Sequence, residues 1–87
     1  MKLVVLYRPQ SEYSRVVEEF VARFKRQYPE KKVEVIDVDS AQGINLAGLY
    51  DITSYPAILA MTEDGSMLNG WMGPTLPLMD EVVSYVR

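Results

Sequence analysis

The first third of the chain predicts a buried strand followed by an amphipathic helix. Leu3–Tyr7 is a continuous apolar and β-branched run, which predicts a strand buried on both faces, as in a parallel sheet. Ser11 is predicted to cap the next helix, with Glu12 in its first turn and Pro29 ending it. Steps of three and four define the buried helix face as Tyr13, Val16, Val17, Phe20, Val21, Phe24 and Tyr28.

The middle of the chain predicts a second strand and a second, shorter helix. Lys32–Asp39 is mostly alternating between polar and apolar residues, as in a strand with one buried face. A helix is expected within Ser40–Tyr50, where Gly43 and Gly48 weaken the helical tendency and leave the helix start undefined.

The last third predicts a hairpin followed by a helix. Ala57–Thr62 and Met67–Met72 are strand-like runs on either side of Glu63-Asp64-Gly65, a sequence typical of a tight hairpin turn. Pro77 suits the first turn of a last helix. The buried face of that helix is predicted to comprise Leu78, Met79, Val82, Val83 and Val86.

The predicted order of elements is β-α-β-α-β-β-α. The long helix between the first two strands predicts that they are parallel with a right-handed crossover, and the last two strands form an antiparallel hairpin. The expected fold is therefore an α/β domain spanning residues 1–87, with a four-stranded mixed sheet flanked by helices.

Composition excludes several chemistries. The 87 residues include no Cys and no His, so the chain has no thiolate, disulfide or imidazole base, and we expect no catalytic residue, metal or cofactor. The net charge of −3 argues against nucleic acid as a partner. The apolar runs are too short to span a membrane or to serve as a secretory signal. We expect a cytoplasmic protein and, with no obvious sticky strand edge, a monomer.

Three segments together resemble the thioredoxin/glutaredoxin family in its short, glutaredoxin-sized form. Val35–Asp39 is similar to the family's second strand, and Tyr50–Leu59 is similar to the segment that leads into the family's cis-proline. The hairpin at Glu63-Asp64-Gly65, followed by Gly73 and by Leu76-Pro77, resembles the family's last hairpin and the start of its last helix. The resemblance covers nearly the whole chain and implies a thioredoxin-like fold.

The family's redox Cys-x-x-Cys motif is the main departure. Ser11-Glu12-Tyr13-Ser14 stands at that place, with Ser11 and Ser14 in the two cysteine positions. A serine hydroxyl is a far weaker acid than a thiol and forms no disulfide, which excludes thiol–disulfide exchange. The buried carboxylate of thioredoxin's first strand is also missing, since Val4-Val5-Leu6 occupies that stretch.

The resemblance implies where a partner would bind. In the family, the residue before the cis-proline offers its backbone to an extended peptide, which assigns that role to Tyr55, beside Pro56. The same resemblance implies a binding set of Tyr7, Gln10, Ser11, Glu12, Tyr13, Ser14, Tyr55, Pro56 and Gly73. Ser11 is best explained as a helix cap, and the alternatives are the relic of a redox site, a ligand site at a helix N-terminus, or half of an engineered Cys-to-Ser pair.

Other polar and apolar clusters have simpler explanations. Asp37 and Asp39 are better explained as strand-end and capping residues than as a metal pair. The basic residues near the end of the first helix favour dipole complementarity and solubility, and Trp71 favours core packing. Four methionines are interpreted as core filler or as an adaptable partner surface: Met61, Met67, Met72 and Met79.

The leading hypothesis is a redox-inactive, thioredoxin-like module that binds a protein or an extended peptide near Tyr55-Pro56. One alternative is a thiol–disulfide oxidoreductase present as a Cys-to-Ser variant. Another is a glutathione-binding protein, because glutathione transferases have a similar first domain and use a Tyr or Ser near the first strand, here Tyr7 or Ser11. A weaker alternative is a small regulator similar to the clock protein KaiB.

Overall fold

The computed structural model describes the backbone of residues 1–86 and the side chains of residues 1–85. The elements follow the predicted order: β1 (Lys2–Tyr7), α1 (Ser14–Gln27), β2 (Lys32–Asp37), α2 (Ala41–Leu49), β3 (Ala57–Met61), β4 (Met67–Met72) and α3 (Met79–Val86). Within this described part, no helix has the length and apolar character that a membrane crossing requires.

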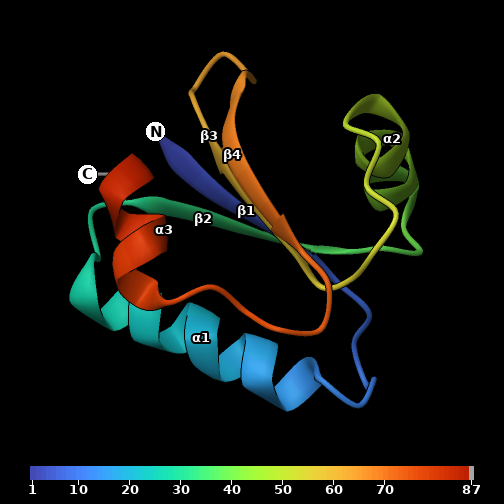
Figure 1. Ribbon diagram of the computed structural model, residues 1–87, viewed down its shortest axis with the longest axis horizontal. Coiled ribbons are helices and arrows are strands. Elements are labelled where there is room, and N and C mark those ends of the chain that lie inside the picture. The colour runs from blue at the N-terminus through green and yellow to red at the C-terminus, as the bar shows by residue number, and fades with distance from the viewer. Residues whose placement is uncertain (87) are drawn as a thin grey trace.

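The strands form one mixed sheet in the order β2-β1-β3-β4. β1 and β2 are parallel, while β3 is antiparallel to both β1 and β4. The helices lie in two layers: α1 and α3 cover one face of the sheet, and α2 lies on the other, as Figure 1 shows. The predicted architecture is confirmed.

The two faces of the central strands build two hydrophobic clusters. Odd-numbered residues of β1, such as Leu3 and Val5, pack with Phe24 of α1 and with Val82 of α3. Even-numbered residues pack with Ile36, Ile52 and Leu59 on the α2 side. Because β1 contributes to both clusters, its residues 3–7 are all buried, as the continuous apolar run predicted.

The start of α1 differs from the prediction. The helix begins at Ser14 after an N-cap at Tyr13 that makes no side-chain cap hydrogen bond, so Ser11 is not the cap and Glu12 is not in the first turn. The backbone explains the shift. Gln10 adopts a left-handed φ of 66°, and the amide of Ser11 donates to the Arg8 carbonyl at 3.3 Å. Residues 8–13 therefore form turns before the helix can begin.

Two residues of the predicted buried helix faces are exposed. Val16 is 52% exposed and Leu78 is 70% exposed, so these assignments were wrong. Val16 lies just outside the stripe that Val17, Val21 and Phe24 bury. Leu78 precedes the first residue of α3, where helical spacing does not yet apply. Val86, also predicted on that face, has a side chain outside the described residues.

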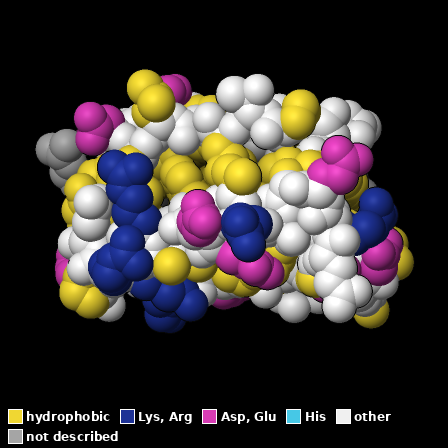
Figure 2. All heavy atoms as spheres, turned by 90° about the horizontal axis from the view of Figure 1, so that it is seen from below, with side chains coloured by type: hydrophobic (Ala, Val, Ile, Leu, Met, Phe, Trp, Pro, Cys, Tyr) yellow, Lys and Arg dark blue, Asp and Glu magenta, His cyan; other side chains and the backbone are white. Residues whose placement is uncertain are grey.

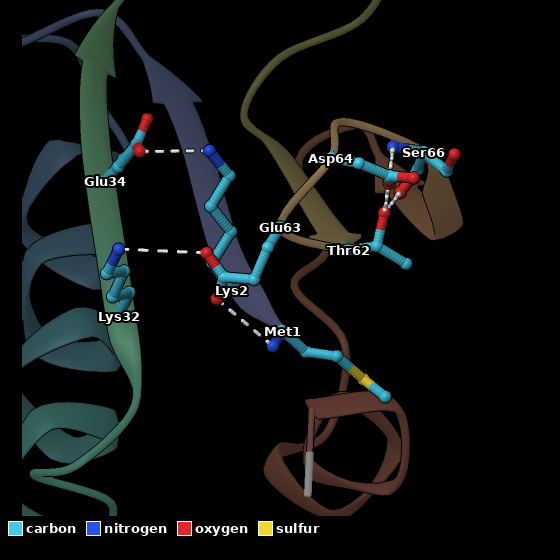
Figure 3. A network of polar contacts seen from close by, with 8 residues as sticks. All are labelled: Met1, Lys2, Lys32, Glu34, Thr62, Glu63, Asp64 and Ser66. Carbon is cyan, nitrogen blue, oxygen red and sulfur yellow. Dashed lines mark hydrogen bonds and ion pairs between the residues drawn. The ribbon is translucent and has the colours of Figure 1, made fainter.

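Ion pairs tie the start of the sheet to the β3–β4 hairpin (Figure 3). Glu63 in the hairpin turn accepts a hydrogen bond from the Met1 amino group at 3.3 Å and lies 3.7 Å from Lys32 Nζ. Lys2 Nζ donates to Glu34 Oε1 at 3.1 Å. The amino-terminal hydrogen bond is the main reason that the pKa of Glu63 is lowered. The pairs of Glu63 are exposed and contribute little stability, whereas the Lys2–Glu34 pair is partly buried; together they neutralise charge along β2.

Candidate functional site

Three segments meet at the end of the sheet where β1 finishes. Leu6 of β1 pairs with Ala57, and Ala57 pairs with Met72, so the segments next to these residues are neighbours in space. They are the turn of residues 8–13 after β1, the Tyr55-Pro56 segment before β3, and Gly73 after β4. The Gly73 amide donates to the Pro56 carbonyl at 3.1 Å, which joins two of these segments. The Tyr55–Pro56 bond is cis.

The turn after β1 is anchored to the segment after β2. Arg8 Nε and Nη2 donate to the two carboxylate oxygens of Asp39 at 3.0 and 3.2 Å. This guanidinium lowers the pKa of Asp39. Both groups are exposed, so the pair positions the turn rather than adding much to stability.

The two serines at the Cys-x-x-Cys place have different surroundings. Ser14 Oγ donates to the Ser11 carbonyl at 3.0 Å, and the Ser14 amide donates to the same oxygen at 3.2 Å. Ser11 Oγ is buried and has no hydrogen-bond partner among the described residues. The two hydroxyls therefore do not bond to each other, and neither has a base as a hydrogen-bond partner among the described residues.

Tyr55 combines an anchored side chain with an unpaired backbone. Its half-buried ring packs against the hydrophobic cluster on the α2 side of the sheet. Within the described residues, its N–H and C=O take part in none of the backbone or side-chain hydrogen bonds, because the β3 ladder begins only at Ala57. The family-implied residues Gln10 and Glu12 are exposed nearby, on the turn after β1.

Tyr7 packs against α1. Its ring is 7% exposed, and its hydroxyl donates to Glu18 Oε2 of α1 at 2.7 Å. The hydrogen bond to Glu18, then desolvation, then the charges of Glu18 and Asp37 raise the pKa of Tyr7 to about 12. At neutral pH the phenol is a hydrogen-bond donor that is already occupied.

The Tyr7 hydrogen bond predicts a loss of stability at alkaline pH. The folded pKa of about 12 lies above the ordinary value of 10.0, so this contribution is complete below pH 10 and is lost as pH rises toward 12. Two pKa units correspond to about 2.7 kcal/mol. The hydroxyl borders an open hollow, however, and solvent screening reduces our expectation to about 1 kcal/mol.

Urea unfolding at pH 8 and pH 11 measures this effect, with Tyr7→Phe as the comparison. The wild-type protein should lose about 1 kcal/mol more than the variant over that interval, because only the wild-type protein has the phenol. An identical pH dependence in the two proteins would contradict the assignment.

The other predicted clusters fall outside this site. Asp37 Oδ1 accepts a hydrogen bond from the Asp39 amide at 2.8 Å, and no group of three or more potential metal ligands occurs among the described residues. Of the methionines, Met61 and Met79 are core residues, while Met67 and Met72 are about 40% exposed on β4. The core role is confirmed for Met61 and Met79, while a partner surface at Met67 and Met72 stays a prediction.

One feature of the molecule had no clear sequence signal. A hollow of about 210 Å³ lies between α1 and β2, lined by Tyr7, Val17, Glu18, Val21, Ala22, Lys25 and Val35. The only clue in the sequence would have been that Val35 is an apolar residue of an alternating strand; the structure exposes its side chain beside the hollow. A second hollow of about 240 Å³ lies on the other side of α1, beside Val16, Phe20 and Leu76.

Figure 2 looks onto the face that α1 and α3 cover, where hydrophobic side chains form a band across the surface. Basic side chains gather toward one end of the same face, where Figure 1 places the C-terminal end of α1. Lys25 and Arg26 lie in that last helical turn, where positive charge complements the helix dipole.

Known structures share this fold at low sequence identity. Thioredoxin O1 from Arabidopsis thaliana superposes with a TM-score of 0.76 at 15% identity, over 98% of this chain and 76% of that one. Fasciola hepatica thioredoxin gives 0.75 at 20% identity, over 95% and 78%. The germline-specific thioredoxin Deadhead from Drosophila melanogaster gives 0.67 at 27% identity, over 85% and 70%. No protein-family model and no curated protein sequence matches the chain.

The fold is therefore thioredoxin-like, and the resemblance inferred from the sequence is confirmed at the level of structure. The identities are those of distant relatives. Because the chain contains no cysteine, this thioredoxin-fold domain is inactive in thiol–disulfide exchange.

Proposed function

We propose that this domain binds an extended protein or peptide segment through the backbone of Tyr55. The observation that carries the proposal is the unpaired N–H and C=O of Tyr55, directly before β3. An extended segment that pairs with these groups adds to the sheet by β-augmentation, in which main-chain hydrogen bonds supply affinity and neighbouring side chains supply specificity.

The surroundings of Tyr55 support a binding role. The turn of residues 8–13 and the Gly73 loop border the same end of the sheet, so a bound segment has walls on two sides. The Arg8–Asp39 pair and the core packing of the Tyr55 ring hold these walls in place before binding. A preformed site reduces the ordering cost of association.

No observation favours the enzymatic alternatives. Tyr7 has its hydroxyl occupied by Glu18, and the Ser11 hydroxyl has no base within hydrogen-bonding distance among the described residues. Neither arrangement provides an activated nucleophile.

Selection of a random-peptide phage library on the purified protein supplies a probe of defined sequence. Titration of the selected peptide, followed by amide chemical shifts, should give the largest changes at Ser54, Tyr55 and Gly73 and in the turn of residues 8–13. N-methylation of the peptide amides that face Tyr55 should weaken binding at least tenfold, because it removes main-chain donors. N-methylation of the alternate amides should have little effect.

Variants of the two outer strands serve as matched controls. Leu68→Lys on β4 and Val35→Pro on β2 each alter an edge of the sheet away from Tyr55. The selected peptide should bind both variants as it binds the wild-type protein. Shifts confined to β2 or β4, or selection of no peptide that shifts Tyr55, would contradict the proposed site.

A further inference from the structure

We propose that two copies of this chain associate through the free edge of β2, forming a continuous antiparallel sheet across a twofold axis. β2 is an outer strand, so one side of its backbone has no neighbour among the described residues. The proposal is independent of the peptide site, because Tyr55 precedes β3, two strands away from β2.

The hydrogen-bond pattern identifies the backbone groups that face outward. The Val38 amide donates to the Tyr7 carbonyl, and because alternate residues of a strand face the same neighbour, Ile36 and Glu34 also face β1. Val33 and Val35 therefore direct both their N–H and C=O away from the sheet. The Asp37 carbonyl is already occupied, since Ser40 donates to it through both its amide and its hydroxyl. The available edge is centred on Val35.

A twofold axis at Val35 gives an antiparallel register that satisfies these groups. The two Val35 residues face each other as a hydrogen-bonded pair and exchange both main-chain bonds. Glu34 then lies opposite Ile36 of the other copy, so no like charges meet. Three charged residues of β2 could discourage edge pairing, and each already has a partner in its own chain: Lys32 pairs with Glu63, Glu34 with Lys2, and Asp37 Oδ1 accepts from the Asp39 amide.

The hollow beside β2 supplies apolar surface for the contact between the two copies. Val35 is 44% exposed and borders this hollow of about 210 Å³ together with Val17, Val21 and Ala22. Edge pairing brings the hollows of two copies together on the α1 side of the sheet, so that each Val35 loses its exposure to water.

The charges that line the hollow match a second copy. Glu18 and Lys25 line it from α1, and α1 runs opposite to β2 in Figure 1. Glu18 is level with the C-terminal end of β2, because it bonds to Tyr7 and Tyr7 pairs with Asp37. Lys25 lies two helical turns away, toward the other end. A twofold rotation therefore sets Glu18 of each copy toward Lys25 of the other, which is a complementary arrangement.

The other edge of the sheet is less suited to pairing. The β3–β4 ladder has a register shift at Ala60 and Met61, and such irregularities twist an edge away from regular pairing. This second-copy proposal differs from the monomer expected from the sequence, and the oligomeric state in solution decides between them.

Sedimentation equilibrium over a range of protein concentrations tests the proposal. The wild-type chain should approach a mass of about 20 kDa, twice its 9.9 kDa. Val35→Pro removes an outward donor that the fold does not use, so it should keep the fold and weaken association at least tenfold. A wild-type protein that stays monomeric throughout, or a folded Val35→Pro that associates as before, overturns the proposal.

If Val35→Pro fails to fold, charge substitutions on α1 test the association instead. Lys25→Glu should weaken association about fivefold, because it sets two acids against each other across the contact. Arg26→Glu makes the same change in net charge on a residue that does not line the hollow, and should leave association unchanged. The double variant Glu18→Lys with Lys25→Glu should restore it. Equal effects of Lys25→Glu and Arg26→Glu overturn the proposed register.

Discussion

Replacing Gly43 with alanine is expected to lower the free energy of unfolding by about 3 kcal/mol, or to prevent folding altogether. A Cβ atom at this position would overlap the Asp37 carbonyl oxygen and lie 3.0 Å from Val38 Cα. Both neighbours are backbone, and the Asp37 carbonyl is held by two hydrogen bonds from Ser40. The added methyl group can therefore be accommodated only if α2 moves away from the end of β2. Urea unfolding measures the loss.

Gly48→Ala is the matched control in the same helix. A Cβ at Gly48 meets nothing within 4 Å, and alanine is the better helix former. This variant should therefore gain about 0.5–1 kcal/mol. Equal effects of the two substitutions would contradict the close approach of α2 to β2, because helix propensity alone predicts a gain at both glycines.

Phe24→Ala should cost about 3–5 kcal/mol, the range for removing a fully buried aromatic side chain. Phe24 is 0% exposed and joins α1 to both β1 and α3, and its ring centroid lies 5.4 Å from that of Tyr28. An 87-residue domain has a total stability of roughly 4–13 kcal/mol, so this single change removes a large part of it. Thermal unfolding followed by circular dichroism should show a markedly lower midpoint, or no cooperative transition.

Val16→Ala tests whether the loss of stability expected for Phe24→Ala is specific to the buried face of α1. Val16 is on the same helix but is 52% exposed, so its replacement should change stability by no more than about 0.5 kcal/mol. A cost at Val16 comparable to that at Phe24 would show that the buried face of α1 includes Val16 after all.

The strands were predictable because their patterns depend on local chemistry and burial. The continuous apolar run of β1 matches its central place in the sheet, which buries both of its faces. The turn at Glu63-Asp64-Gly65 was predictable because it needs a residue with positive φ, and Gly65 adopts a φ of 96° there. Helix spacing identified the buried stripe of α1 correctly at Val17, Val21 and Phe24.

The errors arose where tertiary contacts or loop geometry decide the outcome. Serine preference alone placed the start of α1 at Ser11, whereas the turns of residues 8–13 delay it to Ser14. Gly43 was interpreted as a weak point of a helix, although its role is to let two backbone segments approach each other. Close approach depends on residues that are neighbours only in the folded chain, so a local pattern does not show it.

The candidate site was predictable in outline only. The resemblance to thioredoxins indicated Tyr55 and Pro56, and the fold brings them beside Gly73. The unpaired state of the Tyr55 backbone depends on where the β3 ladder begins; the sequence predicted that start at Ala57, but the pattern does not show which backbone groups of the preceding loop find partners. The Glu18 partner of Tyr7 comes from another element and was not visible in any spacing.

Amide hydrogen exchange at Tyr55 is the most direct test of the central claim, which is that its free backbone binds an extended segment. In the protein alone, the Tyr55 amide should exchange rapidly, because it has no hydrogen-bond partner in the part of the chain that the structure describes, while Ile58 in the ladder stays protected. Saturation with the peptide selected from the phage library should slow exchange at Tyr55 by at least tenfold. An amide that is already protected in the free protein, or that exchanges equally fast with bound peptide, would contradict the account.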